Sequence, residues 1–315
     1  MSILIQLLLF ILISINSIEL ESSTNNNSYK LPICLGMLTY RDDEALNRTL
    51  KSLVNNNFFN IVSQSIIFFQ KVDTIERQEH AKQVLLQYPY FNNNYIIEKA
   101  NIYFESFIKI AQFCTQEYIL ILEEDFMSCV NTSKVMTQMT LATNMLSSKQ
   151  VDLFWLRNRM FMGYPDYMYL AFLKYGTVAY DKLHTSYRIG YLSWNHSAEL
   201  YYPNFNICHI QPKTICTQSK YAFFVNSPTL YTTSNLLKWL HAIPTDKLKK
   251  IHKFEWAMTL VIQSYNYTIA WSDGIYTHIS NKHIKKNNKI ADVVQCISDT
   301  ERIYNSRVSN VKYIS

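Results

Sequence analysis

The feature that most constrains this chain is an apolar run, Tyr118 to Leu122, that ends on three consecutive acids, Glu123, Glu124 and Asp125. An apolar run without alternation is typical of a strand buried on both faces, as at the centre of a parallel sheet. The acids then follow the carboxyl end of that strand, where open α/β sheets bind ligands. Because clustered carboxylates repel one another, we interpret them as a site for a divalent cation and a phosphorylated ligand. A solvated acidic turn is the alternative.

Strands and helices alternate along the first part of the chain. The patterns predict strands over residues 33–39, 65–69, 94–97 and 118–122, and helices over 44–53, 75–88 and 104–113. Asp42 or Asp43 is expected to cap the first of these helices. This alternation favours a parallel sheet built from right-handed βαβ units.

The second part of the chain is less regular. We expect helices over residues 132–146, 234–241 and 254–264, and strands over 151–156, 220–225, 267–271 and 275–279. The aromatic stretch over 160–202 has little helical period and is interpreted as loops, and residues 285–315 as a C-terminal tail.

The first residues of the chain form an apolar segment shorter than the ~20 residues of a membrane-spanning helix. We interpret residues 1–17 as a secretory signal peptide, with an uncleaved signal anchor as the alternative, and residues 18–30 as a polar linker. Asn-x-Ser/Thr triplets agree with entry into the secretory lumen. They begin at Asn26, Asn47, Asn131, Asn195 and Asn266.

The six cysteines are even in number. Cys208 and Cys216 flank a short Pro-containing loop that a disulfide could close, whereas Cys34 and Cys114 lie in apolar segments and are expected to be buried thiols. The sequence contains no Cys-x-x-Cys pair, which disfavours a structural zinc site.

Composition and missing motifs exclude several function classes. A hydrophobic fraction of 48% with 17% charged residues is typical of a globular protein. The net charge of +6 comes without an aromatic-interleaved basic array, so nucleic acid is not an expected partner. The absence of GxGxxG, GxxxxGK[ST] and GxSxG motifs disfavours a dinucleotide enzyme, a P-loop ATPase and a serine hydrolase.

Two constellations together resemble the GT-A class of nucleotide-sugar glycosyltransferases. They are Thr39-Tyr-Arg41 followed by a leucine-spaced helix, and the strand that ends in Glu123-Glu-Asp125. The acidic triplet resembles the DxD motif of that class, in the Glu-Asp-Asp form of Golgi N-acetylglucosaminyltransferases. The resemblance extends over about residues 31–280. It implies an α/β, Rossmann-like GT-A fold with a mostly parallel central sheet flanked by helices. Residues 31–130 would form the nucleotide-sugar-binding half, and residues 131–284 a smaller mixed acceptor-binding half of the same domain.

The resemblance also implies a role for each acid. Asp125 would bind Mn²⁺ or Mg²⁺, hard cations that favour oxygen ligands and bridge the phosphates of the donor. Glu123 would contact the ribose or a metal-bound water, and Glu124 lies at the variable middle position of the motif. The triplet departs from DxD, so the division of work among the three acids stays open. A UDP-sugar is the favoured donor, with a GDP-sugar as the alternative.

The loop after the first strand supplies the remaining donor contacts. A strand that runs into a polar loop and then a helix places backbone donors and Arg41 at the carboxyl edge of the sheet, which suits a nucleotide base or diphosphate. By the resemblance, Thr39 and Tyr40 would line that pocket, and Arg41 would pair with the base or the diphosphate.

Later residues complete the predicted site. His278 follows a strand and an Asp273-Gly274 turn, and the resemblance implies an additional metal or phosphate ligand there; a structural histidine is the alternative. Arg157 and Arg159 alternate along the end of a strand, so they point to the same face and could pair with a phosphate, the acids or a charged acceptor.

An inverting transferase also needs a general base beside the acceptor hydroxyl. We expect Glu255, at the start of an amphipathic helix between aromatics, to fill this role, with Asp166 and Asp246 in reserve. The alternative is an ordinary acid that stabilises the helix N-terminus.

Together these patterns predict a metal-dependent glycosyltransferase that moves a sugar from a nucleoside-diphosphate donor to a glycan or glycoprotein acceptor. Inversion is the favoured mechanism, and retention, which needs no such base, stays open as the alternative. The enzyme would act in the secretory lumen, in the Golgi or ER, or be secreted if the signal is cleaved, and touch the membrane only through an N-terminal anchor. Two alternatives stay open: an inactive GT-A domain that binds sugar or nucleotide, and another metal- and phosphate-dependent enzyme such as a nucleotidyltransferase.

Overall fold

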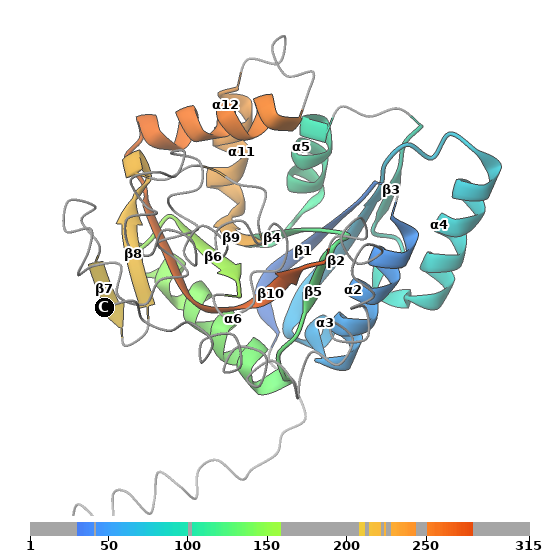
Figure 1. The fold of residues 1–315 in the computed structure, drawn as a ribbon, viewed down its shortest axis with the longest axis horizontal. Helices are drawn as coiled ribbons and strands as arrows, with labels where there is room; N and C mark the ends of the chain where they lie inside the picture. Colours follow the sequence, from blue (N-terminus) through green and yellow to red (C-terminus); the bar gives the residue numbers. More distant parts are fainter. Residues whose placement is uncertain are drawn as a thin grey trace, which may run out of the picture. The chain divides into compact units, whose positions relative to one another are not determined.

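The apolar strands predicted from the sequence assemble into one mixed sheet (Figure 1). The computed structural model describes residues 30–40, 42–99, 103–158, 208–211, 214–221, 224, 228–243 and 251–279. Within them, the strand order is β3-β2-β1-β4-β9-β6-β10-β8-β7, and β5 lies off this path, paired with β10. All of these strands belong to the unit that begins at Leu31.

The first half of the sheet is parallel throughout. It contains β1 (Leu31–Thr39), β2 (Val62–Phe69), β3 (Tyr95–Ile97) and β4 (Tyr118–Glu123). The second half is mixed. It contains β5 (Phe126–Ser128), β6 (Leu153–Arg157), β7 (Cys208–Gln211), β8 (Thr214–Gln218), β9 (Thr229–Thr232) and β10 (Thr268–His278). Strands β5, β8 and β9 run against the other strands of the sheet.

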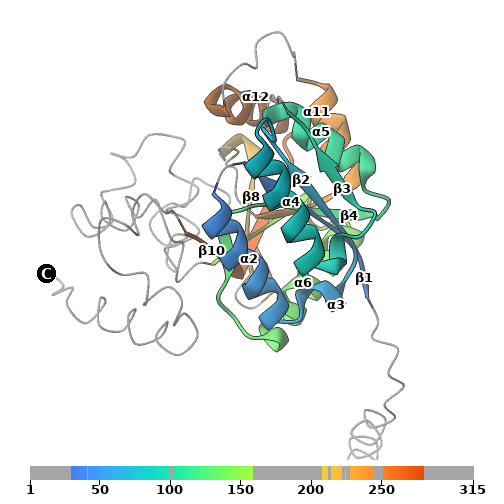
Figure 2. The same ribbon diagram turned by 90° about the vertical axis from the view of Figure 1, so that its right-hand side faces the viewer.

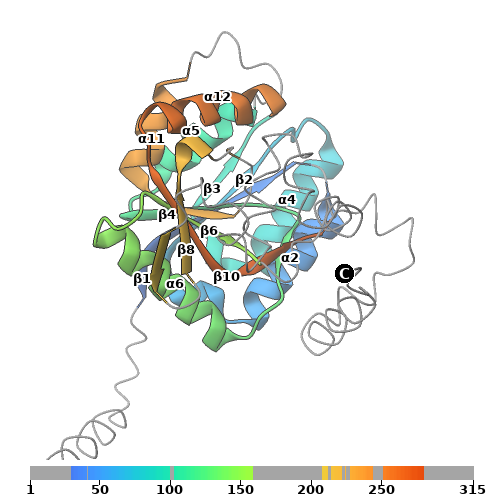
Figure 3. The same cartoon turned by 60° about the vertical axis from the view of Figure 1, so that its left-hand side comes forward.

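Helices cover both faces of the sheet (Figures 1, 2 and 3). One face is packed by α2 (Asp43–Asn55), α3 (Phe58–Ile61), α4 (Ile75–Gln87) and α6 (Thr132–Ser147). The other is packed by α5 (Tyr103–Phe113), α11 (Thr233–His241) and α12 (Ile251–Ser264). Two short 3₁₀ helices, η1 (Pro89–Phe91) and η4 (Ser219–Tyr221), complete the described elements. This layering is the predicted α/β, Rossmann-like GT-A fold, and the prediction is confirmed.

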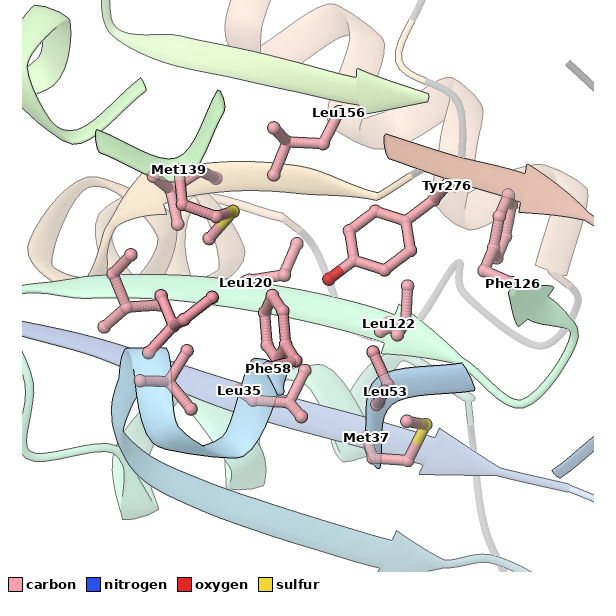
Figure 4. Packing of buried hydrophobic residues seen from close by; sticks show 14 of the residues in the cluster. Leu35, Met37, Leu53, Phe58, Leu120, Leu122, Phe126, Met139, Leu156 and Tyr276 are labelled. Atoms are coloured by element: carbon pink, nitrogen blue, oxygen red, sulfur yellow. The ribbon is translucent and has the colours of Figure 1, made fainter. Parts of the chain in front are cut away.

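Strand β1 separates two cores because successive side chains of a strand point to opposite faces. Leu35 and Met37 lie in the core under α2 and α6 (Figure 4), and Cys34 and Leu38 lie in the core under α5. Gly36 lies where α5 approaches most closely, since a Cβ there would lie 2.3 Å from Cγ2 of Ile110. β1 is therefore buried on both faces.

Two predictions about the second half were wrong in detail. A strand was expected over 220–225, but Ser219 to Tyr221 form η4, because the Ser219 hydroxyl donates to the Ile262 carbonyl at 2.7 Å and ties the chain to α12. The two strands expected over 267–271 and 275–279 are one strand, β10, with an irregular register between Trp271 and Tyr276. Strands β5, β7, β8 and β9 were not predicted.

The cysteines divide as expected where the structure describes them. Cys34 and Cys114 are free and buried. Cys216 and Cys129 are disulfide-bonded. Cys208 lies directly opposite Cys216 in the β7–β8 pairing, and the bond between these two stays a prediction.

Several predicted segments lie outside the described residues: the leader 1–17, the linker up to residue 29, the aromatic stretch 160–202 and the tail 285–315. The division into halves at residue 130 also stays a prediction. No helix among the described residues is long and apolar enough to cross a membrane.

Candidate functional site

The carboxyl ends of four strands meet at one edge of the sheet. Because β1, β4, β6 and β10 run in the same direction, their last residues, Thr39, Glu123, Arg157 and His278, all lie at that edge. The predicted donor loop, acids, arginine and histidine therefore converge, although they come from widely separated parts of the chain.

Glu124, the middle acid, fixes the loop after β1. Its two carboxylate oxygens accept backbone N–H groups, Oε2 from Tyr40 and Oε1 from Asp42 at 3.0 Å. The Thr49 hydroxyl of α2 donates to the Glu124 carbonyl at 2.7 Å. Both carboxylate oxygens thus bind the protein's own backbone. The structure gives Glu124 a part in holding the predicted donor loop against β4.

The loop residues after β1 are held from several sides. Thr39 is buried, and its carbonyl accepts the Gln70 amide at 3.0 Å. Tyr40 is 41% exposed, yet its carbonyl accepts a hydrogen bond from Arg77 and its ring lies 4.7 Å from the Lys71 ammonium. An exposed aromatic ring held this firmly is suited to contact a flat ligand.

Asp125 and His278 form a pair at the centre of the edge. His278 Nε2 donates to Asp125 Oδ2 across 2.7 Å, and the Asp125 carbonyl accepts the Ile279 amide at 2.6 Å. The imidazole stacks on the ring of Phe126 with centroids 4.8 Å apart. The other carboxylate oxygen, Asp125 Oδ1, is buried without a hydrogen-bond partner in the described structure. A buried carboxylate oxygen without a partner is costly, which favours a ligand at this atom.

A bulge in β10 delivers His278 to this position. Residues up to Trp271 pair with β6, the register then shifts, and Tyr276 to His278 pair with β5. Gly274 lies in the bulge at φ +71°, and a Cβ there would lie 2.1 Å from the Arg157 carbonyl oxygen. Only glycine fits this backbone without strain. The Asp273-Gly274 turn expected from the sequence is thus a bulge within one strand.

Glu123 lies partly buried at the end of β4, and the Tyr103 hydroxyl of α5 donates to its Oε1. Burial raises the pKa of Glu123 well above its usual value, and the charge of Asp125 raises it further, while the hydrogen bond from Tyr103 acts in the opposite direction. Sequence reasoning missed Tyr103, because an aromatic at the start of a helix resembles any other core residue. The acid is therefore anchored by a helix on one face of the sheet.

Glu255 reaches the same cluster from α12. Its negative charge raises the pKa of both Glu123 and Tyr103, so its carboxylate lies within electrostatic reach of the acids. The helix begins at Ile251, so Glu255 lies one turn inside it and not at its start as expected. Acids stabilise the helix dipole mainly in the first turn, and this position weakens the purely structural interpretation.

Arg157 is the last residue of β6, and its guanidinium carbon lies 5.9 Å from the centre of the Phe126 ring. It therefore shares the edge with the acids. Arg41, Arg159, Asp166 and Asp246 lie outside the described residues, so their predicted roles stay predictions.

The side chains at this edge can be compared with the ligands that Mn²⁺ or Mg²⁺ requires. No group of three or more His, Cys, Asp or Glu side chains in the described part of the chain could hold a metal ion by itself. Mg²⁺ is commonly held by one or two carboxylates, with substrate phosphates and water as the other ligands. Asp125, with its partnerless buried oxygen, and His278 fit such an open site.

Comparisons with known proteins give only distant likenesses. No family model matches the chain, and no curated protein matches it. The solved structure of S. aureus TarS 1–349 is 12% identical with a TM-score of 0.45, and the match covers 90% of this chain and 66% of that one. The same protein in complex with UDP-GlcNAc gives 12% identity and a TM-score of 0.44, over 90% of this chain and 68% of that one.

A mannosyltransferase from Pyrobaculum calidifontis, PcManGT, in complex with GDP-Man and Mn²⁺, is 11% identical with a TM-score of 0.46, over 80% of this chain and 57% of that one. The chain thus spans between 57 and 68% of the length of these structures. Likenesses at this level carry no argument about activity, which depends on the residues of the site.

Proposed function

We propose that the protein is a metal-dependent glycosyltransferase that moves a sugar from a nucleoside-diphosphate donor to a glycan or glycoprotein acceptor. The observation that carries the proposal is the convergence of Asp125, its partnerless oxygen and His278 with Glu123 and Glu255 at the carboxyl edge of the sheet. This edge is where open α/β sheets bind nucleotides.

The donor would bind along the loop after β1 and the end of β4. Tyr40 is the exposed aromatic of that loop, and Glu124 fixes its backbone, so the base would meet a surface that is already ordered. Asp125 and His278 would hold the cation. When bound, that cation would stabilise the negative charge that develops on the leaving diphosphate. A UDP-sugar stays the favoured donor, with a GDP-sugar as the alternative.

The acceptor would approach from the side of α12. Glu255 is the carboxylate that this helix brings to the acids, and as general base it would take the proton of the attacking acceptor hydroxyl. A general base on the acceptor side favours inversion at the anomeric carbon.

We also propose that the protein acts in the secretory lumen. The support is the apolar leader and the glycan acceptor triplets, of which the three that the structure describes, Asn47, Asn131 and Asn266, are exposed. Exposure is what an attached glycan requires.

The proposal is tested by thermal unfolding of the full-length protein with UDP, GDP, CMP or ADP, each with Mn²⁺ and with excess chelator. A nucleotide at ~100 times its dissociation constant should stabilise the fold by about 2.7 kcal/mol. We expect one nucleotide to raise the melting temperature only when Mn²⁺ is present, and Asp125→Asn to abolish that rise.

Asp152→Asn is the matched control. Asp152 lies just before β6, at the opposite edge of the sheet, where its Oδ2 accepts the Thr268 amide at 2.8 Å. This variant should keep the full response to nucleotide. A folded wild-type protein that responds to no nucleotide, or that responds equally in chelator, would overturn the metal-dependent donor site.

A further inference from the structure

Tyr103 lies where the donor side and the acceptor side of the candidate site meet. Its hydroxyl donates to Oε1 of Glu123, and the charges that raise its pKa are those of Glu123, Glu255 and Asp125, after the larger effect of burial. A hydroxyl that donates a hydrogen bond to one member of an acidic cluster fixes how that member is oriented.

The ring of Tyr103 is held independently of this hydrogen bond. Its centroid lies 5.2 Å from the ring of Phe107, on its own helix, and 5.7 Å from the ring of Phe254 on α12. Aromatic pairs at these separations are stabilising in their own right. Packing therefore fixes where the hydroxyl lies, and the hydroxyl in turn fixes the carboxylate.

Glu123 needs such an anchor because its neighbours repel it. Asp125, Glu255 and Glu124 all act on it as negative charges. A carboxylate surrounded in this way would turn away from the cluster and toward solvent unless a donor held it. In the described structure, the Tyr103 hydroxyl is such a donor, and it belongs to a rigid helix.

We propose that Tyr103 is a positioning residue that holds Glu123 ready to accept a hydrogen bond from a hydroxyl at the donor site, either of the ribose or of a water on the metal. This inference rests on the proposed function and adds a residue to it. Tyr103 touches no donor atom itself, since it acts through Glu123. Its removal should weaken donor binding, not slow the chemical step.

The test is Tyr103→Phe, which keeps the ring packing and removes only the hydroxyl. The dissociation constant of the nucleotide preferred by the wild type is measured by calorimetry with Mn²⁺, together with KM and kcat for its sugar donor. Loss of a hydrogen bond to a charged group corresponds to about a tenfold change in affinity. We expect the dissociation constant and KM to rise about tenfold while kcat changes less than about threefold.

Tyr118→Phe is the matched control, because it removes the same kind of bond at the other end of the same strand. The Tyr118 hydroxyl donates to Glu117 Oε1 at 2.7 Å, at the start of β4, whereas Glu123 lies at its end. Tyr118→Phe can lower the melting temperature, but it should leave nucleotide affinity unchanged. Equal loss of affinity in both variants would mean that Tyr103 acts only through stability, and would overturn the inference.

A double-mutant cycle shows whether Tyr103 acts through Glu123. If it does, Tyr103→Phe should change affinity less than twofold in a Glu123→Gln background. An undiminished tenfold effect in that background would overturn the inference, as would unchanged affinity in Tyr103→Phe alone. Absence of nucleotide binding by the wild type is a different result, since it overturns the proposed function itself.

Deoxynucleotides identify the hydroxyl from which Glu123 accepts a hydrogen bond. If it belongs to the ribose, the wild type should prefer the ribonucleotide over its 2′- or 3′-deoxy form about tenfold, and Tyr103→Phe should lose this preference. If the cycle holds and neither protein discriminates, the hydroxyl is that of a metal-bound water. Both results support the positioning role and differ only in the ligand.

Discussion

The two halves of the sheet reach the same edge by different routes. In the first half, β1 to β4 pair with one another in parallel, and the helices between them pack on the sheet. In the second half, β9 lies between β4 and β6, and β10 lies between β6 and β8, so spatial neighbours come from distant segments. The first half is therefore built from local units, and the second is defined by long-range pairing.

This difference extends to the site. The first half contributes Glu123, Glu124 and Asp125 from one strand end, and the second contributes Glu255 and His278 from two separate elements. Mutual repulsion among the three acids disfavours their ionised forms. The second half adds a hydrogen-bond partner for Asp125, His278, and a further negative charge, Glu255. Variants in the second half therefore test most directly what each half contributes to the candidate site.

The largest effect is expected for Glu255→Gln. If the second half supplies the general base, turnover should fall by about two to four orders of magnitude while nucleotide binding persists. The measurement is the rate of nucleotide release from the preferred sugar donor in the presence of mixed oligosaccharide acceptors. Glu105→Gln, an exposed glutamate in the first turn of α5, is the control and should keep wild-type turnover. Unchanged turnover in Glu255→Gln would place the chemistry elsewhere.

A smaller effect, on stability, is expected for glycines in the two halves. Gly274→Ala should lower the free energy of unfolding by about 3 kcal/mol, because it combines a positive φ with a Cβ 2.1 Å from a backbone oxygen. Chemical denaturation measures the loss. Gly274→Ala should also weaken the response to Mn²⁺, since the bulge sets the position of His278.

Gly36→Ala is the counterpart in the first half. There the obstacle is a side-chain methyl of Ile110 at 2.3 Å and not the backbone. Shortening the obstacle in Gly36→Ala/Ile110→Ala should therefore recover part of the stability lost in Gly36→Ala, relative to Ile110→Ala alone. No side-chain truncation should rescue Gly274→Ala. If a side-chain truncation restored the stability of Gly274→Ala, or if Ile110→Ala did not restore that of Gly36→Ala, the result would contradict the geometry described above.

The smallest effect is expected for Tyr276→Phe. Tyr276 comes from β10, and its ring packs against Phe58. Its hydroxyl points toward Leu120 in the core under α2 and α6 (Figure 4). This hydroxyl is buried without a hydrogen-bond partner in the described structure, and burial raises its pKa well above the usual value. Removing it should raise the free energy of unfolding by about 1 kcal/mol.

Tyr231→Phe is the comparison for this effect. Tyr231 is equally buried, in the other core, but Thr229 hydrogen-bonds its hydroxyl. Its removal should lower the free energy of unfolding by about 1 kcal/mol. Urea denaturation measures the change in the free energy of unfolding for both variants. A change of the same sign in both would show that hydrogen-bond partners of these hydroxyls do not decide whether their removal stabilises the protein.

Local patterns were sufficient for the first half of the fold. The helix over Asp43–Asn55 begins where its cap was expected, since Asp42 Oδ1 accepts the Ala45 amide at 3.0 Å. The short strands β5 and β9 were missed because each is too brief to show a period, and pairing with distant strands stabilises them. A single sequence contains no measure of such pairing.

The structure brings the acids and His278 of the predicted site to one edge of the sheet, and the function of that edge stays a prediction. Strand ends indicated that Asp125 and His278 share an edge, since both follow apolar runs. The attachment of Glu124 to the loop and of Glu123 to Tyr103 depends on side-chain directions that spacing along the chain does not determine. For this reason, spacing along the chain could not predict the different surroundings of the three acids.

The pairing of His278 with Asp125 joins residues 153 positions apart in the chain. Ribosomes make β1 to β4 first, whereas a domain generally folds as one unit. The acids of β4 are therefore synthesised well before the strand that carries their histidine partner. A nascent chain that stops short of β10 therefore contains the acids of β4 and still lacks the histidine, so the pair can form only after β10 has been made.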